Sequence, residues 1–198
     1  MKKPITTIIF VLFSILSGGC SAGCDHMQER PAGQSDVIAL ACDPIPVVRV
    51  GFIGLGMRGI GAVERFMHLD SVEVVALCDL EAENLARSQA VLREKAKPEA
   101  AEYMGPEGWK RLCERPDIDL VYISTDWLSH TPMAVYAMEQ GKHVAVEVPA
   151  AVTVEECWKL VDTAEKTRRH CMMLENCCYD FFELATLNMA QRGLFGEI

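Results

Sequence analysis

The glycine-rich hexapeptide at residues 54–59 restricts most strongly what this chain can fold into. It consists of Gly54, Leu55, Gly56, Met57, Arg58 and Gly59, and it ends an almost continuous apolar run that begins at Val47. Such a run is typical of a β-strand that is covered on both faces. Apolar residues at helical spacing follow the glycines, namely Ile60, Val63 and Met67. The sequence therefore predicts a strand, a tight turn and a helix, in that order.

The same alternation continues to the end of the chain. Apolar and partly β-branched runs at 72–78, 119–124, 143–148 and 171–174 predict further strands. Because helical patterns separate these runs, the strands should be parallel and joined by right-handed crossovers. The sequence therefore predicts an α/β domain with a doubly wound parallel sheet, the Rossmann fold. We expect the acid-rich stretch 94–114 to be a solvated loop and helix, with Trp109 and Leu112 facing inward.

Local signals place the ends of several predicted helices. Thr131 and Pro132 suit the cap and the first position of one helix, and Gly141 suits its end. Thr153 and Glu156 have the spacing of a capping box, which predicts a helix from there to about residue 169. The last predicted helix covers residues 181–192.

The first twenty residues differ from the rest of the chain. A basic start, a short apolar run and small residues before Cys20 form the layout of a secretory signal. The apolar run is too short to cross a hydrocarbon layer of about 30 Å as a helix. The small residues that end in Cys20 resemble a bacterial lipoprotein processing site, with Cys24 as the alternative. We expect a signal peptide at 1–20, a flexible tether at 21–46 and the folded domain at 47–198.

The glycine-rich loop predicts a binding site for a dinucleotide. Gly54 permits a tight turn, Gly56 lets the backbone approach a diphosphate, and Gly59 lets helix and strand pack closely. Asp79 follows about twenty residues later at the end of a predicted strand, where its carboxylate can bind ribose hydroxyls and repel a 2′-phosphate. This pattern favours NAD, although the nearby cation of Arg58 keeps NADP open. The alternative is a doubly wound domain that uses these glycines only for packing.

The charge balance excludes nucleic acid as a partner. The chain has 19 Lys and Arg against 28 Asp and Glu, a net charge of -9, so no basic surface dominates. No spacing of Cys and His matches a zinc site, and we expect no metal. Most of the nine cysteines should be free thiols, with Cys24 and Cys42 as the candidate pair.

From Val47 onward the chain resembles the Gfo/Idh/MocA oxidoreductases, whose first domain is a dinucleotide-binding fold. The resemblance rests on the 54–59 loop, on Asp79, on the strand at 119–124 and on the stretch 141–149. Most of that family carries Glu-Lys-Pro where this chain has Glu147, Val148 and Pro149, and the family's lysine helps the chemistry at the sugar carbinol. A valine cannot donate a proton, so the usual dehydrogenase activity is not the first expectation.

Three stretches instead resemble the NAD-dependent glycosidases of glycoside hydrolase family 109, the α-N-acetylgalactosaminidases. They are 147–149, 127–130 (Trp-Leu-Ser-His) and 175–180 (Glu-Asn-Cys-Cys-Tyr-Asp). The resemblance implies NAD contacts from a set of residues spread over the chain: Met57, Arg58, Asp79, Trp127, Leu128, Ser129, His130, Glu147, Val148 and Asn176. It also makes Tyr179 a candidate on the substrate side.

The activity that this resemblance implies is hydrolysis of α-linked N-acetylgalactosamine, with a small glycoside as substrate. NAD⁺ takes a hydride from C3 of the sugar, the aglycone leaves from C1 after loss of the C2 proton, water adds, and the hydride returns. In that family a second, α+β domain follows the region around residue 193, so we expect the substrate domain and the catalytic base to lie beyond residue 198. The catalytic residues are therefore unknown.

Two other functions stay open: an exported sugar dehydrogenase of the broader family, and a non-catalytic NAD-binding protein. We expect export and attachment to a bacterial membrane through lipid on Cys20 alone. The oligomeric state is open, a homo-oligomer included.

Overall fold

The computed structural model describes residues 30, 34–178 and 180–197. The described residues from Asp36 onward belong to one compact unit. The expected signal peptide with Cys20, the alternative lipid site Cys24, and Tyr179 lie outside the described residues. No helix in the described ranges is long and apolar enough to cross a membrane.

A single six-stranded sheet organises the folded unit, with the strand order β3-β2-β1-β4-β5-β6. All neighbouring strands are parallel. The strands are β1 (Val48–Ile53), β2 (Val72–Asp79), β3 (Ala101–Met104), β4 (Leu120–Ile123), β5 (His143–Glu147) and β6 (Cys171–Leu174). The chain adds strands in one direction up to β3 and then returns to pair β4 with β1, which makes the junction of β1 and β4 the topological switch point. The predicted doubly wound parallel sheet is confirmed.

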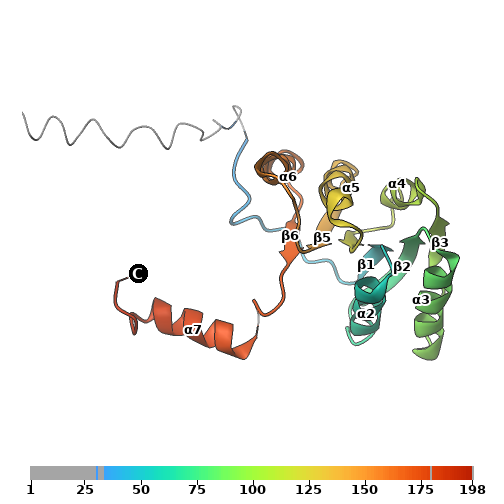
Figure 1. Ribbon diagram of the computed structural model, residues 1–198, viewed down its shortest axis with the longest axis horizontal. Coiled ribbons are helices and arrows are strands. Elements are labelled where there is room, and N and C mark those ends of the chain that lie inside the picture. The colour runs from blue at the N-terminus through green and yellow to red at the C-terminus, as the bar shows by residue number, and fades with distance from the viewer. Residues whose placement is uncertain (1–29, 31–33, 179, 198) are drawn as a thin grey trace, which may run out of the picture. The chain divides into compact units, whose positions relative to one another are not determined.

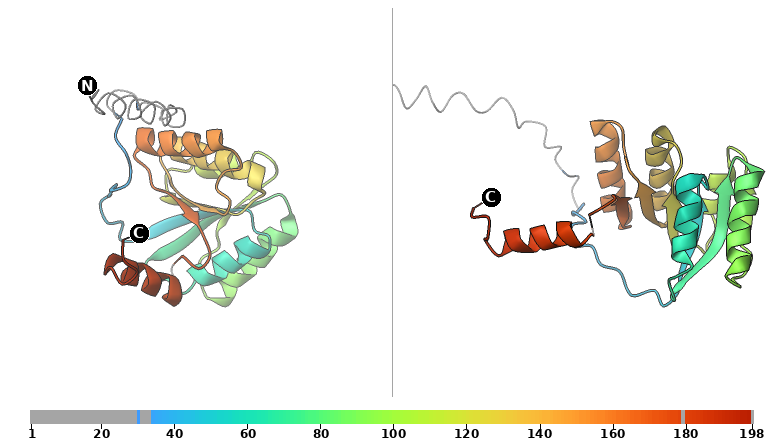
Figure 2. Two further views of the ribbon diagram at one scale, coloured as in Figure 1. Left: turned by 60° about the vertical axis from the view of Figure 1, so that its left-hand side comes forward. Right: turned by 60° about the horizontal axis from the view of Figure 1, so that its bottom comes forward.

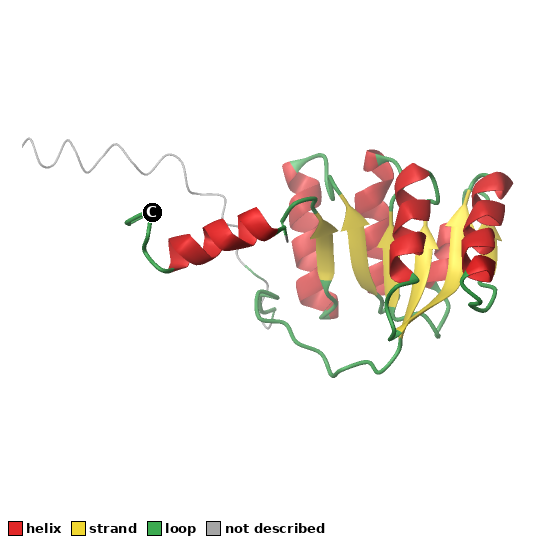
Figure 3. Cartoon of the chain, turned by 90° about the horizontal axis from the view of Figure 1, so that it is seen from below, coloured by secondary structure: helices red, strands yellow, loops and turns green. Residues whose placement is uncertain are grey.

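Helices cover both faces of this sheet (Figures 1 and 3). On one face lie α2 (Met57–Phe66) and α3 (Ala82–Glu94), and on the other lie α4 (Gly108–Cys113), α5 (Trp127–Glu139) and α6 (Val154–Thr167). The left view in Figure 2 shows the two helix layers on opposite sides of the sheet. The last helix, α7 (Phe181–Gln191), follows β6 and contains no buried residue.

Each face of the sheet has its own apolar core because successive strand residues point to opposite sides. Phe52 is fully buried on the side of α2 and α3, where its ring stacks on Tyr122 with centroids 5.0 Å apart. The next residue, Ile53, is buried on the side of α4, α5 and α6. Both faces of β1 are therefore covered, as its continuous apolar run predicts.

The sequence analysis missed strand β3. Its residues pair with β2 from Ala76↔Ala101 to Asp79↔Met104, yet three of its four side chains are exposed. An edge strand of this kind is held by backbone pairing and carries no apolar run that a sequence pattern can detect. The expectation for the following helix is confirmed, because Leu112 is fully buried and Trp109 packs against the core.

The start of α5 was also predicted wrongly. The helix begins at Trp127 with Asp126 as its cap, so Thr131 and Pro132 lie inside it. Thr131 is buried and donates its hydroxyl hydrogen to the carbonyl oxygen of Ala150 at 2.9 Å. The predicted end is confirmed, since Gly141 has a φ of +79° directly after the helix.

The predicted capping box at the start of α6 is present. Glu156 N donates to Thr153 Oγ1 at 3.2 Å, and Thr153 N donates to Glu156 Oε2 at 3.2 Å. The helix ends at Thr167, close to the expected position.

The described part of the expected tether touches the domain. Val37 packs against the core under α5 and α6, and Arg168 donates to the carbonyl oxygen of Asp36 at 2.9 Å. Cys42 is a free and exposed thiol, and its expected partner Cys24 lies outside the described residues.

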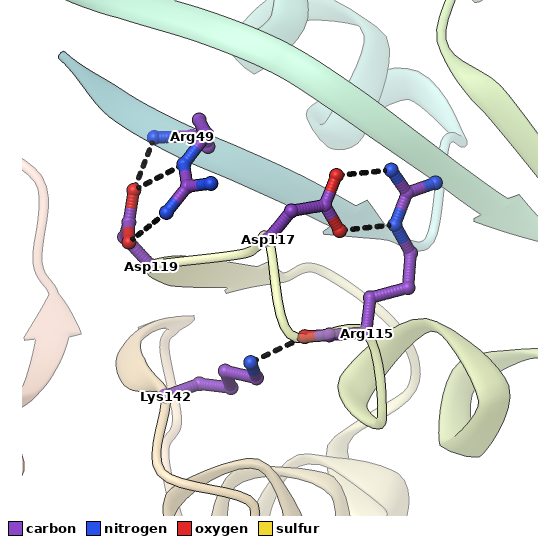
Figure 4. Close-up of polar contacts among 5 residues, drawn as sticks. All are labelled: Arg49, Arg115, Asp117, Asp119 and Lys142. Carbon is purple, nitrogen blue, oxygen red and sulfur yellow. Dashed lines mark hydrogen bonds and ion pairs between the residues drawn. The ribbon is translucent and has the colours of Figure 1, made fainter.

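A charged network lies at the amino edge of the sheet (Figure 4). Asp119 accepts from Arg49 Nε at 3.0 Å, from Arg49 Nη2 at 2.9 Å and from the Arg49 backbone amide at 2.9 Å. Arg115 makes a two-point contact with Asp117 at 2.8 and 2.6 Å. The buried ammonium of Lys142 donates to the carbonyl oxygen of Arg115. These contacts join the starts of β1, β4 and β5 at the edge opposite the glycine-rich loop.

Candidate functional site

A crevice opens at the carboxyl edge of the sheet, where the segments after β1 and β4 lead to helices on opposite faces. Its volume is about 540 Å³, and Gly54, Gly56, Asp79 and Ser129 lie in its wall. The other lining residues are Ile53, Cys78, Leu80, Glu81, Asn84, Gly105, Pro106, Trp109, Ser124, Thr125, Asp126 and Met133. In doubly wound folds this switch point is the place where ligands bind.

Steric crowding explains two of the three glycines in the loop. Gly54 has a φ of +85°, and a Cβ there would lie 2.5 Å from the carbonyl oxygen of Ser124. At Gly59 a Cβ would lie 2.0 Å from the carbonyl oxygen of Gly54. The tight turn and the close packing that the sequence predicts at these two positions are therefore confirmed.

Gly56 differs from its two neighbours because a Cβ there would meet nothing within 4 Å. It precedes the first residue of α2, and no side chain caps the amides of that helix end. Those amides carry partial positive charge and are free to bind an anion. The open space beside Gly56 thus fits a diphosphate that approaches the backbone closely.

Asp79, at the end of β2, is held in a fixed orientation at the rim of the crevice. Its Oδ1 accepts from Glu81 N at 2.9 Å and from Asn84 Nδ2 at 3.1 Å, and its Oδ2 accepts from Leu55 N at 2.6 Å. A carboxylate has about four acceptor positions, so one remains on Oδ2. The carboxylate is thus positioned to bind a ribose hydroxyl beside the glycine-rich loop.

The charged side chains that line the crevice are all carboxylates: Asp79, Glu81 and Asp126. No Lys or Arg is among its lining residues. Because a 2′-phosphate needs a cation to bind it, this wall fits NAD better than NADP.

Arg58 turns away from Asp79 and lies in a second cluster. Its Nη2 lies 3.1 Å from Glu147 Oε2, at the end of β5, and 3.0 Å from Asn176 Oδ1, after β6. Glu147 is 6% exposed, and its Oε1 accepts from the hydroxyl of Tyr122 at 2.6 Å. We call Arg58, Glu147, Tyr122 and Asn176 the Arg58 cluster. The guanidinium of Arg58 is therefore already bound by Glu147 and Asn176, whereas a free guanidinium at this position would have favoured NADP.

The surroundings favour the protonated forms of both donors in this cluster. The hydrogen bond and the charge of Glu147 raise the pKa of Arg58 above its usual range. Burial, followed by the hydrogen bond to Glu147, raises the pKa of Tyr122 well above that of a free tyrosine. Arg58 therefore stays cationic and Tyr122 stays a hydrogen-bond donor at any ordinary pH.

The first turn of α5 forms the opposite wall of the crevice. Asp126 accepts from Leu128 N at 3.1 Å, from Ser129 N at 3.2 Å and from the hydroxyl of Ser129 at 2.6 Å. The hydroxyl of Ser129 is the main cause that lowers the pKa of Asp126. Trp127 is 64% exposed and Leu128 is 72% exposed, so both leave apolar surface free beside the crevice.

His130 lies behind this wall and is almost fully buried. Its Nδ1 lies 2.8 Å from the carbonyl oxygen of Pro149, and its Nε2 lies 3.2 Å from that of Thr125. The ring therefore joins the loop after β4 to the loop after β5, where Val148 is half-buried. In this position His130 acts on the site through backbone groups.

The structure thus distributes the candidate residues over four places. Gly54, Gly56, Asp79 and Ser129 line the crevice. Arg58, Glu147 and Asn176 form the neighbouring cluster. Met57, Trp127 and Leu128 are exposed. Gly59 and His130 pack behind the loops, and Val148 is half-buried in one of them. Within the described ranges, no group of three or more His, Cys, Asp or Glu could hold a metal ion.

Sequence reasoning missed two residues of the site. Asn84 positions Asp79, but an asparagine in the first turn of a helix gives no signal of its own. Asp126 did give a signal, since Asp is a preferred cap and it directly precedes Trp127. The better-known pattern of Thr131 and Pro132 obscured it.

Comparison with known proteins agrees with this geometry. Residues 48–175 match the Gfo/Idh/MocA oxidoreductase family, described by its NAD-binding Rossmann fold. Among solved structures, the WlbA dehydrogenase from Chromobacterium violaceum, in complex with NADH and UDP-GlcNAcA, is 22% identical with a TM-score of 0.65. That comparison covers 79% of this chain and 44% of the dehydrogenase, and at this identity it shows the fold alone.

Curated relatives are much more similar in sequence. An alpha-N-acetylgalactosaminidase from Bacteroides fragilis is 65% identical over 169 residues, which are 85% of this chain and 40% of the relative. A glycosyl hydrolase family 109 protein from the same species is 64% identical over 192 residues, which are 94% of this chain and 41% of the relative. The chain therefore spans about 40% of the length of these relatives.

Proposed function

The chain belongs to the Gfo/Idh/MocA oxidoreductase family, and from this premise we propose that it is the NAD-binding portion of a glycosidase that hydrolyses α-linked N-acetylgalactosamine. The observation that carries the proposal is the 65% identity to the alpha-N-acetylgalactosaminidase of Bacteroides fragilis over 169 residues.

Val148 supports a glycosidase over a sugar dehydrogenase. It stands where the resemblance to the wider family leads one to expect a lysine, and its half-buried side chain has no proton to give. A dehydrogenase that relies on this position for proton transfer would lack the necessary group. The two curated relatives described above are glycosidases by name, in line with this difference.

In the proposed reaction, bound NAD⁺ supplies a reversible hydride acceptor, which permits oxidation at C3, elimination of the aglycone, addition of water and return of the hydride. The chain itself supplies the binding site. The amides at the start of α2 would hold the diphosphate. Asn84 and the amide of Glu81 fix Asp79, whose carboxylate would accept a hydrogen bond from a ribose hydroxyl.

The remaining contacts position the other end of the cofactor. Trp127 and Leu128 provide an apolar wall at the mouth of the crevice, and the Arg58 cluster fixes polar groups at the ends of β5 and β6. His130 keeps the two loops behind that wall together. We propose that the sugar contacts and the catalytic base come from a further domain, and that this chain without it does not hydrolyse glycosides.

A domain exchange tests the proposal. Residues 48–198 of this chain would replace the corresponding segment of the alpha-N-acetylgalactosaminidase from Bacteroides fragilis. We expect the exchanged enzyme to retain NAD through gel filtration and to release nitrophenol from 4-nitrophenyl α-N-acetylgalactosaminide with no accumulation of NADH. Asp79→Ala in the exchanged enzyme should abolish both properties.

Two outcomes would contradict the glycosidase. One is a folded exchanged enzyme that retains NAD and cleaves no glycoside under conditions in which the parent does. The other is stoichiometric NADH formation from free sugars, which would indicate a dehydrogenase. Arg87→Gln, an exposed position on α3 away from the crevice, is the matched control and should leave activity unchanged.

We further propose that the protein is exported and held at a bacterial membrane by lipid on Cys20, with a small glycoside as its partner. A cofactor that is regenerated in each cycle suits a compartment without a free NAD pool. Incorporation of a labelled fatty acid that is lost in Cys20→Ser and kept in Cys24→Ser would support this assignment; the reverse pattern would move the lipid to Cys24.

A further inference from the structure

The ion pair between Arg58 and Glu147 has an unusual position for a structural contact. It joins the first turn of α2, next to the phosphate-binding glycines, to the end of β5, and the two residues are 89 positions apart in sequence. The Glu147 side chain is 8% exposed, whereas that of Arg58 is 49% exposed. The pair thus consists of a buried carboxylate whose charge is balanced by a cation at the surface of the site.

The position of Glu147 assigns it to one end of the cofactor. A doubly wound sheet has two mononucleotide-binding halves, and the half that contains the glycine-rich loop and Asp79 takes the adenosine end. Glu147 ends β5, in the other half. The nicotinamide end therefore lies on the side of Glu147.

The two redox forms of the nicotinamide differ in charge. The oxidised ring carries one positive charge and the reduced ring is neutral, so a nearby carboxylate favours the oxidised form unless a cation balances it. Arg58 provides that balance. The other partners of the pair are neutral: Tyr122 donates to Glu147, and Asn176 accepts from Arg58. A second cation, Arg65 of α2, interacts with Tyr122 and through it with the pair.

We propose that the Arg58–Glu147 pair sets the relative affinity of the site for NAD⁺ and NADH. This inference rests on the proposed function, because an enzyme that returns its hydride in each cycle has to retain both forms of the cofactor. With the charge of Glu147 balanced, neither form is strongly favoured and neither is lost during turnover. Arg58 acts here as a positioning residue whose effect passes through Glu147.

Binding measurements on the full 198-residue chain test the inference. Dissociation constants for NAD⁺, NADH and ADP-ribose would be measured by titration calorimetry, for wild type, Arg58→Gln, Glu147→Gln and the double variant. In Arg58→Gln we expect the ratio Kd(NADH)/Kd(NAD⁺) to rise about threefold to tenfold, the effect of one unbalanced charge acting over several ångströms. In Glu147→Gln the ratio should fall, and in the double variant it should return toward that of wild type.

ADP-ribose distinguishes this role from direct contact with the diphosphate, because it lacks the nicotinamide. Its affinity should be unchanged in Arg58→Gln. An equal loss of affinity for all three ligands would overturn the inference and assign Arg58 to the diphosphate. An unchanged ratio in both single variants would overturn it as well.

Two further variants keep the test decisive. Arg58→Lys retains the charge and should keep the wild-type ratio Kd(NADH)/Kd(NAD⁺). If Arg58→Gln does not fold, the comparison of Arg58→Lys with Glu147→Gln replaces it. Arg87→Gln removes the same charge from an exposed position on α3 and should change nothing. A wild-type chain that binds none of the three ligands would refute the cofactor site of the proposed function. Binding with the same ratio Kd(NADH)/Kd(NAD⁺) in wild type and in both single variants would refute this inference alone.

Discussion

At the scale of single residues, the glycine-rich loop is specified by van der Waals contact. The backbone of Ser124 crowds Gly54, and the carbonyl oxygen of Gly54 crowds Gly59, so that neither glycine has room for a methyl group. Gly61 lies on the same helix two residues later, where a Cβ would only approach the flexible end of Arg65 at 3.4 Å. Two glycines of one helix therefore have opposite requirements.

This contrast makes a paired prediction. Gly59→Ala should lower the free energy of unfolding by about 1–3 kcal/mol, because the new methyl group has to displace backbone atoms. Gly61→Ala should raise it by about 0.5–1 kcal/mol, since alanine is the better helix former and meets no obstacle. Urea unfolding of both variants measures the difference; equal effects in the two would show that the crowding at Gly59 is relieved at little cost.

Arg58 shows what a sequence cannot provide at this scale. Its place in the loop identifies it as a cation near the expected dinucleotide, and that much was predicted. Its partners lie 89 and 118 residues further along the chain, at Glu147 and Asn176. Because such contacts depend on the register of β5 and β6 against the rest of the sheet, no local pattern reveals that Arg58 is already engaged.

At the scale of elements, the sequence predicts what has a period or a buried run. The strands β1, β2, β4 and β5 were predicted because at least half of the residues in each are buried under a helix layer. Strand β6 was predicted from its apolar run, although its two central side chains are exposed. Strand β3 has exposed side chains and was missed. The capping box of α6 was recognised because its two partners are three residues apart, whereas the start of α5 was placed too late.

The corrected start of α5 leads to a prediction on Asp126. Asp126→Ala removes acceptors for two amides and a hydroxyl and should lower the free energy of unfolding by about 1 kcal/mol. Asp126→Asn is the matched control, because asparagine caps helices equally well and should cost little. Thermal unfolding at neutral pH compares the two variants. Identical losses of stability would mean that the charge of Asp126, and not its role as a helix cap, stabilises the fold.

The pH dependence of this cap has a definite sign. The hydroxyl of Ser129 lowers the pKa of Asp126 in the folded protein below its ordinary value of 3.8. The contribution of Asp126 is therefore complete above that value and is lost as the pH falls through the folded-state pKa. The difference in free energy of unfolding between wild type and Asp126→Ala should accordingly narrow on acidification and stay constant from pH 5 to 7.

At the scale of the whole molecule, the sheet separates stabilisation from ligand binding. The crevice and the Arg58 cluster occupy the carboxyl edge, and the network of Arg49, Asp119, Arg115, Asp117 and Lys142 occupies the amino edge (Figure 4). Burial lowers the pKa of Lys142, so its ammonium depends on the carbonyl of Arg115 and the nearby carboxylates. Changes at the amino edge should therefore affect the fold and spare the site.

Asp119→Asn tests this separation. The substitution weakens three hydrogen bonds from Arg49 and should lower the free energy of unfolding by about 1–3 kcal/mol. The affinity for NAD⁺ should be unchanged, and Asp70→Asn, at an exposed loop position, should alter neither quantity. Denaturant unfolding and calorimetric titration on the same samples give both values; a parallel loss of affinity would show that the two edges are coupled.

The contribution of this network to stability decreases on acidification, as does that of Asp126. The Arg49 guanidinium lowers the pKa of Asp119 below its ordinary value of 3.8, so its contribution is present above that pH and is lost as the pH falls further. Wild type should therefore lose stability below about pH 4 more steeply than Asp119→Asn, which has no carboxylate to protonate.

The contact between Arg58 and Asn176 spans 118 residues, and this separation has a consequence for biosynthesis. Contacts of such long range form late, because a long stretch of chain has to become ordered before its ends can meet. During translation, α2 and its glycines leave the ribosome well before β6 exists. A nascent chain should therefore complete the Arg58 cluster only when β6 has docked, so that full retention of a fluorescent NAD analogue would report the docking of β6.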